Sequence, residues 1–141
     1  MIVDIETAGF DANKNPLLEI AAVIVEYDSN QQLHITESHA AHIIPFESSI
    51  LDQSALKFTG IDPYHPFRLA VSEKDALGKL FNPIKLAVKR NECTRAILVG
   101  HNPNFDINFL NAALKRTKIK RSPFHPFSTF DTATLGGLMY K

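Results

Sequence analysis

The sequence contains a single cysteine, carries no net charge and has no long apolar run. Because Cys93 has no second cysteine to pair with, the chain forms no internal disulfide and no zinc site built on several thiolates. No apolar segment approaches the roughly 18 residues of a membrane-spanning helix, and no signal peptide is recognisable. These absences predict a cytoplasmic protein that makes no contact with a membrane.

The charges cancel over the whole chain, with fifteen basic and fifteen acidic residues, so net charge indicates no partner. Their distribution is uneven, because residues 1–84 hold five Lys/Arg against twelve Asp/Glu, whereas residues 85–141 hold ten against three. One interpretation is an acidic half that binds cations and a basic half that binds phosphates. The other is a chance partition of solvated surface, and the pattern alone does not choose between them.

The length of 141 residues fits one domain with one core, and 45% hydrophobic residues is ordinary for a globular protein. Residues 1–141 contain no repeat, low-complexity segment or linker, which predicts a single domain. Both ends are abrupt, because Met1 stands directly before the first strand and residues 132–141 resemble a helix or turn that stops. We therefore expect an incomplete domain, shortened at both ends.

Apolar periodicity predicts an α/β domain that begins with an antiparallel meander of three strands. The expected strands of this meander are residues 1–6, 17–27 and 33–44. Helices and strands then alternate, at residues 50–58, 73–90, 96–100, 104–117 and 127–130, with a last helix starting near 132. Gly60 is expected to end the first helix, Ser72 to begin the second, and Pro83 to kink or split it.

The first ten residues, MIVDIETAGF, carry two carboxylates on a short apolar run that breaks at Gly9. Side chains alternate along a strand, so Asp4 and Glu6 are expected to point from the same face. Adjacent carboxylates supply the oxygen ligands that Mg²⁺ and Mn²⁺ prefer. The alternative is the polar face of a half-buried strand, and two carboxylates at this spacing do not exclude it.

A second polar segment, HNPNFD at residues 101–106, follows the predicted buried strand AILVG. Asp106 falls near the N-terminus of the next helix, where the helix dipole favours negative charge, and this gives it a structural explanation. Strand ends are also the places where α/β sheets build their sites. Three carboxylates brought together repel one another unless cations lie among them.

Four segments in order carry a resemblance to a known family: DIETAGF, LLEIAAV, HNPNFD and HPFSTFDTA. Together they resemble the ribonuclease T family of the DEDD superfamily of 3′→5′ exonucleases, histidine subtype, over nearly the whole chain. The resemblance implies a ribonuclease H-like fold with a mixed sheet, three antiparallel strands and then a β-α-β unit, without its C-terminal helical part. Oligoribonuclease and the proofreading subunits of DNA polymerase are alternatives that the AGF and HPFSTFDTA segments disfavour.

The resemblance implies trimming of single-stranded 3′ ends of RNA, in the maturation of tRNA and other stable RNAs, with DNA ends as a further substrate. The reaction it implies is two-metal phosphodiester hydrolysis with two Mg²⁺ ions per site, or Mn²⁺. Asp4 and Glu6 match the first exonuclease motif and Asp106 matches the second, which makes them metal ligands and catalytic residues. Asp131 is assigned a supporting role near the substrate.

Four phenylalanines match positions at which the family stacks the terminal bases of its substrate: Phe10, Phe58, Phe105 and Phe127. Stacking needs no contact with the base edges, so it suits 3′ ends of varied sequence. From the residues alone each of the four is a core residue by default. This applies most strongly to Phe105, which has helical spacing with Phe109.

The basic half of the chain supplies candidates for a phosphate-binding surface, namely Lys89, Arg95, Lys120 and Arg121. In the family a basic patch on one subunit serves the active site of the other, so the resemblance implies a homodimer. Solubility is the alternative explanation. Lys115 and Arg116, near a helix C-terminus, are explained by their interaction with the helix dipole.

The family's third motif, a histidine followed five residues later by aspartate, has no counterpart after Asp131. In the family this histidine is the general base and the aspartate is the fourth carboxylate. A basic segment that the family carries before the first strand is also missing. We therefore expect residues 1–141 alone to be inactive or severely impaired, with a catalytically dead nucleic-acid-binding or dimerising fragment as the alternative.

Overall fold

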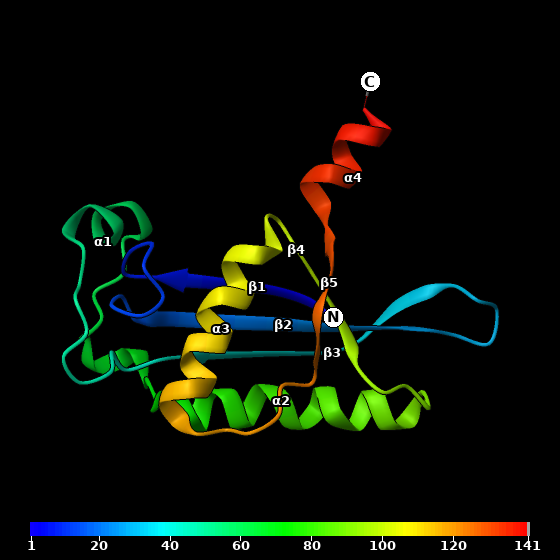
Figure 1. The fold of residues 1–141 in the computed structure, drawn as a ribbon, viewed down its shortest axis with the longest axis horizontal. Helices are drawn as coiled ribbons and strands as arrows, with labels where there is room; N and C mark the ends of the chain where they lie inside the picture. Colours follow the sequence, from blue (N-terminus) through cyan, green and yellow to red (C-terminus); the bar gives the residue numbers. More distant parts are fainter. Residues whose placement is uncertain (141) are drawn as a thin grey trace.

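The structure is a computed structural model that describes residues 1–140, and its centre is a five-stranded mixed sheet (Figure 1). The sheet order is β3-β2-β1-β4-β5, in which β1 pairs antiparallel with β2 and β2 with β3, whereas β1–β4 and β4–β5 are parallel. The strands are β1 (Ile2–Thr7), β2 (Leu17–Tyr27), β3 (Leu33–His42), β4 (Ala96–Gly100) and β5 (Phe124–Asp131). The predicted α/β fold is confirmed, with its antiparallel meander followed by parallel strands.

One face of the sheet is buried and the other is accessible. Along β1, Val3 and Ile5 are buried, whereas Ile2 and Asp4 are exposed, as the period of two along a strand requires. We call the accessible side the open face. It carries both the carboxylates of β1 and isolated apolar side chains such as Ile97 of β4.

Two helices, α2 (Glu73–Arg90) and α3 (Pro103–Thr117), cover the buried face (Figure 1). The predicted start of α2 is confirmed, because Ser72 Oγ accepts a hydrogen bond from the Asp75 amide at 3.1 Å. The expected split at Pro83 is wrong, since α2 continues through that residue as one helix. Burial of the flanking Phe81 and Ile84 in the core outweighs the one backbone hydrogen bond that proline removes.

The remaining helices are shorter and lie at the edges of the molecule. Asp52 caps the start of α1 (Gln53–Thr59), and Gly60 ends it in the left-handed conformation at φ 70°, as predicted. A short 3₁₀ helix spans Pro66–Arg68. The last helix, α4 (Thr132–Met139), buries no residue and extends away from the body of the molecule (Figure 1). None of the helices described between residues 1 and 140 is long and apolar enough to cross a bilayer.

Candidate active site

Two of the predicted catalytic carboxylates lie side by side on the open face of β1. Asp4 is exposed and Glu6 is half-buried, and they alternate with the buried Val3 and Ile5. Together they line a cavity of about 220 Å³ whose other walls come from β2 and β3. The same-face placement expected from the sequence is therefore present.

The electrostatic surroundings of Glu6 disfavour its charged form. Burial raises the pKa of the Glu6 carboxyl, and the negative charges of Asp4 and Glu19 raise the pKa further. Glu19 exerts this effect because it is the cross-strand partner of Glu6 in the β1–β2 register. A cation placed here would relieve the repulsion among the three side chains.

Glu19 and His42 also line this cavity, and the sequence did not identify them as site residues. His42 Nδ1 lies 2.8 Å from Glu19 Oε1, and the Arg68 guanidinium lies 3.5 Å from the same oxygen. These contacts hold the Glu19 carboxylate beside Glu6. The signal available in the sequence was an acid inside the otherwise apolar run LLEIAAV, on the face that β2 shares with Glu6.

Asp106 is placed in the first turn of α3, with only 4% of its surface exposed. It lies on the core-facing stripe of that helix, one turn before Phe109 and Leu110. Burial first, and then the nearby charge of Asp4, raise the pKa of Asp106 to about 6. The first-turn position expected from the helix-dipole argument is correct, but the burial brings an additional cost for the charged form.

This burial predicts a pH-dependent stability in the metal-free protein. Because the pKa of Asp106 rises from 3.8 to about 6 on folding, the folded state keeps a proton that the unfolded state loses. The unfolding free energy should therefore fall by about 2–3 kcal/mol as pH rises from 4 to 7, relative to Asp106→Asn. Urea denaturation of both proteins in chelator measures the difference, and parallel pH profiles would contradict it.

The donor set of Asp4, Glu6 and Asp106 fits a divalent cation chemically, since it offers only carboxylate oxygens. Within residues 1–140, no three His, Cys, Asp or Glu side chains converge closely enough to form a ready metal-binding group. The raised pKa values of Glu6 and Asp106 mark both carboxylates as groups whose charge lacks compensation. Their assignment as metal ligands stays a prediction.

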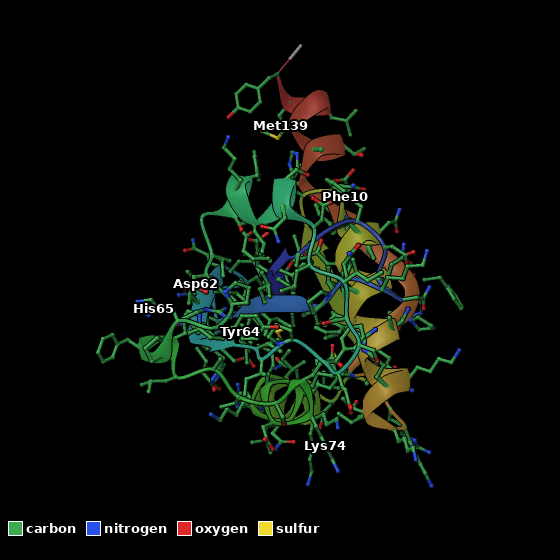
Figure 2. All side chains as sticks on the ribbon, turned by 90° about the vertical axis from the view of Figure 1, so that its left-hand side faces the viewer. Phe10, Asp62, Tyr64, His65, Lys74 and Met139 are labelled. Carbon is green, nitrogen blue, oxygen red and sulfur yellow. The ribbon has the colours of Figure 1, made fainter. Side chains whose placement is uncertain are left out.

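Three of the predicted stacking phenylalanines converge on a second cavity, of about 390 Å³, which we call the phenylalanine pocket. Phe10 follows β1, Phe58 belongs to α1 and Phe105 to the first turn of α3. Figure 2 places Phe10 between α1 and α3, and its ring meets Phe105 edge-on at 6.1 Å between centroids. Glu6 lines this pocket as well as the carboxylate cavity, so the two are adjacent.

The exposure of these rings tests the interpretation of the phenylalanines as core residues. Phe10, Phe58 and Phe127 are 85%, 92% and 84% exposed, so the default assignment to the core is wrong for them. Phe105 is partly buried and packs against the core through Phe109, at 4.9 Å. Phe127 lies on β5 beside the His125 ring, outside the phenylalanine pocket.

Asp131 connects the ends of two strands. Its Oδ1 accepts hydrogen bonds from the amides of Ala133 and Asn102, and its Oδ2 accepts one from Thr134 Oγ1. These bonds lower the pKa of the Asp131 carboxyl. Through these three bonds Asp131 caps α4 and fixes the loop that leads to Asp106, and its role near the substrate stays a prediction.

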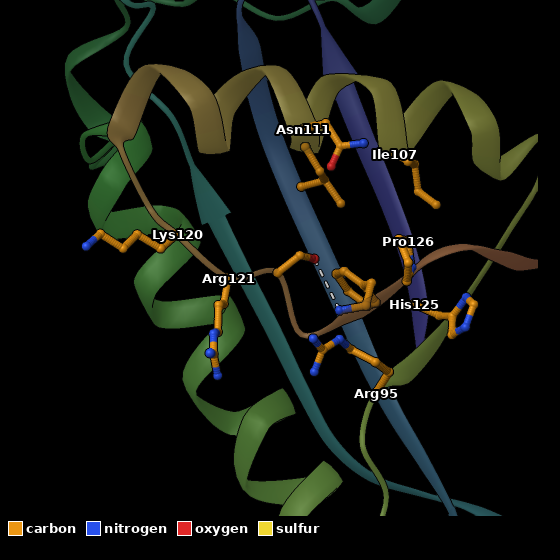
Figure 3. Close-up of a pocket in the computed structure, with 10 residues that line it drawn as sticks. Arg95, Ile107, Asn111, Lys120, Arg121, His125 and Pro126 are labelled. Carbon is orange, nitrogen blue, oxygen red and sulfur yellow. Dashed lines mark hydrogen bonds between the residues drawn. The ribbon is translucent and has the colours of Figure 1, made fainter.

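Three of the four predicted phosphate-binding residues, Arg95, Lys120 and Arg121, line one cavity of about 260 Å³, together with His125 (Figure 3). We call it the basic cavity. Lys89 is in the last turn of α2 and does not line it. The basic cavity is next to Phe124, where β5 begins, and Ile107, Leu110 and Asn111 of α3 also line it, whereas Asp106 of the same helix is buried.

A family model described as an exonuclease, RNase_T, matches residues 1–141. The chain belongs to the RNase_T exonuclease family. The resemblance to ribonuclease T drawn from the four sequence segments is thereby confirmed. The carboxylates of β1 and α3 are therefore placed within an exonuclease fold.

Relatives within the RNase_T family are longer than this chain. Ribonuclease T of Marinobacter nauticus is 56% identical over 140 residues, covering 99% of this chain and 63% of the relative. Ribonuclease T of Photorhabdus laumondii is 53% identical over 139 residues, covering 99% and 64%. The chain thus spans less than two thirds of the length of these curated relatives.

Solved structures support the fold assignment. Escherichia coli exonuclease I in complex with a dT13 oligonucleotide superposes with a TM-score of 0.72 at 19% identity, over 99% of this chain and 29% of that chain. A product-bound structure of exonuclease I gives a TM-score of 0.72 at 18% identity, over 99% and 31%. The chain therefore shares the fold of the matching part of these exonuclease I chains.

Proposed function

We propose that this chain forms the nuclease domain of a metal-dependent 3′→5′ exoribonuclease. The observation that carries this proposal is that Glu6 lines both the carboxylate cavity and the phenylalanine pocket. A base stacked between Phe10 and Phe58 would hold its phosphodiester next to the carboxylates. Because stacking tolerates every base, such a site trims ends of varied sequence, including those of tRNA and other stable RNAs.

In this proposal Asp4 and Glu6 of β1 and Asp106 of α3 hold the cations, and Asp131 positions the loop before α3. Mg²⁺ ions, or Mn²⁺, would supply an activated water and stabilise the leaving oxygen. Glu6 and Asp106 must lose their protons to act as ligands, so their raised pKa values make cation affinity rise between about pH 4 and 7. Phe105 forms the wall of the phenylalanine pocket on which the base rests, and its ring is held in place by packing against Phe109 of the core.

We also propose that the basic cavity binds substrate phosphates for the active site of a second subunit. Arg95, Lys120 and Arg121 line this cavity beside Ile107 of α3, whereas Asp4 and Glu6 line a different cavity. The proposal includes a homodimer, in which the basic cavity of one subunit faces the carboxylates of the other. DNA ends are the alternative substrate, and a cytoplasmic location stays a prediction.

The same proposal predicts binding without efficient trimming by residues 1–141. These residues contain no histidine after His125 and no acid after Asp131, and hence no general base at the family's third motif. We expect trimming of a labelled single-stranded RNA with Mg²⁺ to be about 10²–10⁴-fold slower than by full-length Marinobacter nauticus ribonuclease T. Gel-shift titration in chelator should still detect binding of the same RNA.

The outcomes separate the two candidate functions. Binding that depends on Phe10 and Phe58, with slow trimming, supports the exonuclease domain, whereas binding with no metal-dependent trimming supports a catalytically dead binding or dimerising module. Trimming at the rate of the longer relative would contradict the expected loss of the general base. The absence of both RNA binding and trimming would contradict the proposed function itself.

A further inference from the structure

Arg116, in the last turn of α3, forms a bidentate ion pair with Glu73 at the start of α2. The Nε and Nη2 atoms of Arg116 donate to the two carboxylate oxygens of Glu73 at 3.0 and 2.7 Å. Glu73 is only 7% exposed and the Arg116 side chain 21%. This pair is therefore largely removed from solvent, unlike the surface cations around it, and it joins the two helices that cover the sheet.

The guanidinium has a third contact, which reaches the loop that carries Phe10. Arg116 Nη1 donates to the backbone oxygen of Ala12 at 2.7 Å, and the guanidinium lies 4.2 Å from the Phe46 ring centroid. We call residues 8–16, between β1 and β2, the Phe10 loop. Ala12 is two residues past Phe10, so this hydrogen bond fixes the backbone beside the stacking ring.

The Phe10 side chain is 85% exposed, so packing contributes little to its position. Its place depends on how the loop backbone is held. Asn15 holds one end of the loop, by accepting from the Asp11 amide at 2.8 Å and donating to the Ile50 oxygen at 2.8 Å. Arg116 holds the middle of the loop through its hydrogen bond to Ala12. Arg116 belongs to α3, the helix whose first turn contains Asp106.

We infer that Arg116, oriented by Glu73, is a positioning residue for the phenylalanine pocket: it holds the Phe10 loop so that Phe10 stacks on the 3′-terminal base. The inference rests on the proposed function. It goes beyond the helix-dipole explanation of Arg116, since the guanidinium is occupied by Glu73, Ala12 and Phe46. Only arginine can fill this position, because its planar donors point in several fixed directions at once.

The test compares two labelled pentanucleotide RNAs that differ only in the last nucleotide, which carries either a base or an abasic ribose. The ratio of their dissociation constants in chelator, measured by fluorescence anisotropy, reports stacking on the terminal base alone. Phe10→Ala should lower this ratio about fivefold or more. Arg116→Lys keeps the charge opposite Glu73 but loses the bond to Ala12, and should lower the ratio at least about threefold.

Arg90→Lys is the matched control, because Arg90 also makes a bidentate pair, with Glu26, but does not touch the Phe10 loop. It should leave the ratio unchanged. Combining Arg116→Lys with Phe10→Ala should add little to Phe10→Ala alone, because both changes remove the same stacking contact. If Arg116→Lys does not fold, Glu73→Gln serves instead, and should lower the ratio about twofold or more by weakening the orientation of the guanidinium.

Three results overturn the inference. A folded Arg116→Lys or Glu73→Gln protein that keeps the wild-type ratio contradicts the positioning role, while leaving the phenylalanine pocket intact as a base site. Full additivity in the double variant shows that Arg116 acts elsewhere. A ratio of one in the unsubstituted protein contradicts base stacking in the proposed function, and the positioning role with it.

Discussion

Replacement of Gly9 by alanine is expected to lower the unfolding free energy by about 2–5 kcal/mol. Gly9 has a φ of +143°, and a Cβ at this position would lie 2.4 Å from Asn15 Cγ. Moving Asn15 aside is costly, because this residue is only 8% exposed and its side chain forms hydrogen bonds with the backbone of Asp11 and Ile50. Urea denaturation measures the loss, and base-dependent RNA binding should fall with it because Gly9 precedes Phe10.

Gly60→Ala provides a matched control for this prediction. Gly60 also has a positive φ, of 70°, but a Cβ there would meet no atom within 4 Å. Only the backbone cost remains, of about 1–2 kcal/mol. Equal losses of unfolding free energy in Gly9→Ala and Gly60→Ala would show that the contact with Asn15 does not contribute. If the contact does contribute, adding Asn15→Ala to Gly9→Ala should restore part of the stability.

Asp4→Asn is expected to weaken divalent-cation binding by about 100-fold or more, which corresponds to about 2.7 kcal/mol. The substitution removes one charge from a cation site that we propose to contain three carboxylates, and leaves a weaker amide ligand in its place. In the unsubstituted protein, saturating Mg²⁺ or Mn²⁺ should raise the melting temperature, because the cation binds the folded state alone. In Asp4→Asn this rise should vanish at the same concentration.

Asp131→Asn is the control for Asp4→Asn, because it removes a nearby carboxylate that we do not propose as a cation ligand. Asp131 accepts three hydrogen bonds and caps α4, so its replacement should cost about 1 kcal/mol of stability. The cation-induced rise in melting temperature should be retained. A loss of cation response equal to that of Asp4→Asn would show that Asp131 is itself a ligand.

Much of the fold followed from local rules that the tertiary structure respects. The apolar run at 17–27 forms β2, Gly60 ends α1 in the left-handed conformation, and Ser72 caps α2. The expected split at Pro83 did not occur, because the packing of α2 against the sheet, which the sequence does not show, outweighs one lost backbone hydrogen bond.

The candidate site was predictable where a single element determines it. The period of two along β1 placed Asp4 and Glu6 on one face, and the position after the AILVG strand placed Asp106 near the start of α3. The acid inside LLEIAAV was the only signal for Glu19, and the contribution of His42 was not predictable, because it depends on the register between β2 and β3.

Ring exposure and ion pairing also depend on tertiary contacts. From its residue type alone, a phenylalanine is expected in the core. Only the arrangement of α1, α3 and the Phe10 loop leaves Phe10 and Phe58 at the rim of a pocket. Arg116 fitted a simple helix-dipole explanation, but its partner Glu73 is 43 residues away in sequence. Only the structure could connect it with the loop that carries Phe10.

The most direct test of the central claim is a crystal of this protein soaked in Mn²⁺ and measured for anomalous scattering. We expect an anomalous difference peak with carboxylate oxygens of Asp4, Glu6 and Asp106 around it, on the side of Glu6 that faces the phenylalanine pocket. The peak should disappear in Asp4→Asn crystals soaked in the same way. A peak elsewhere on the molecule, or a peak that survives Asp4→Asn, would contradict the assignment of these carboxylates as the catalytic metal site.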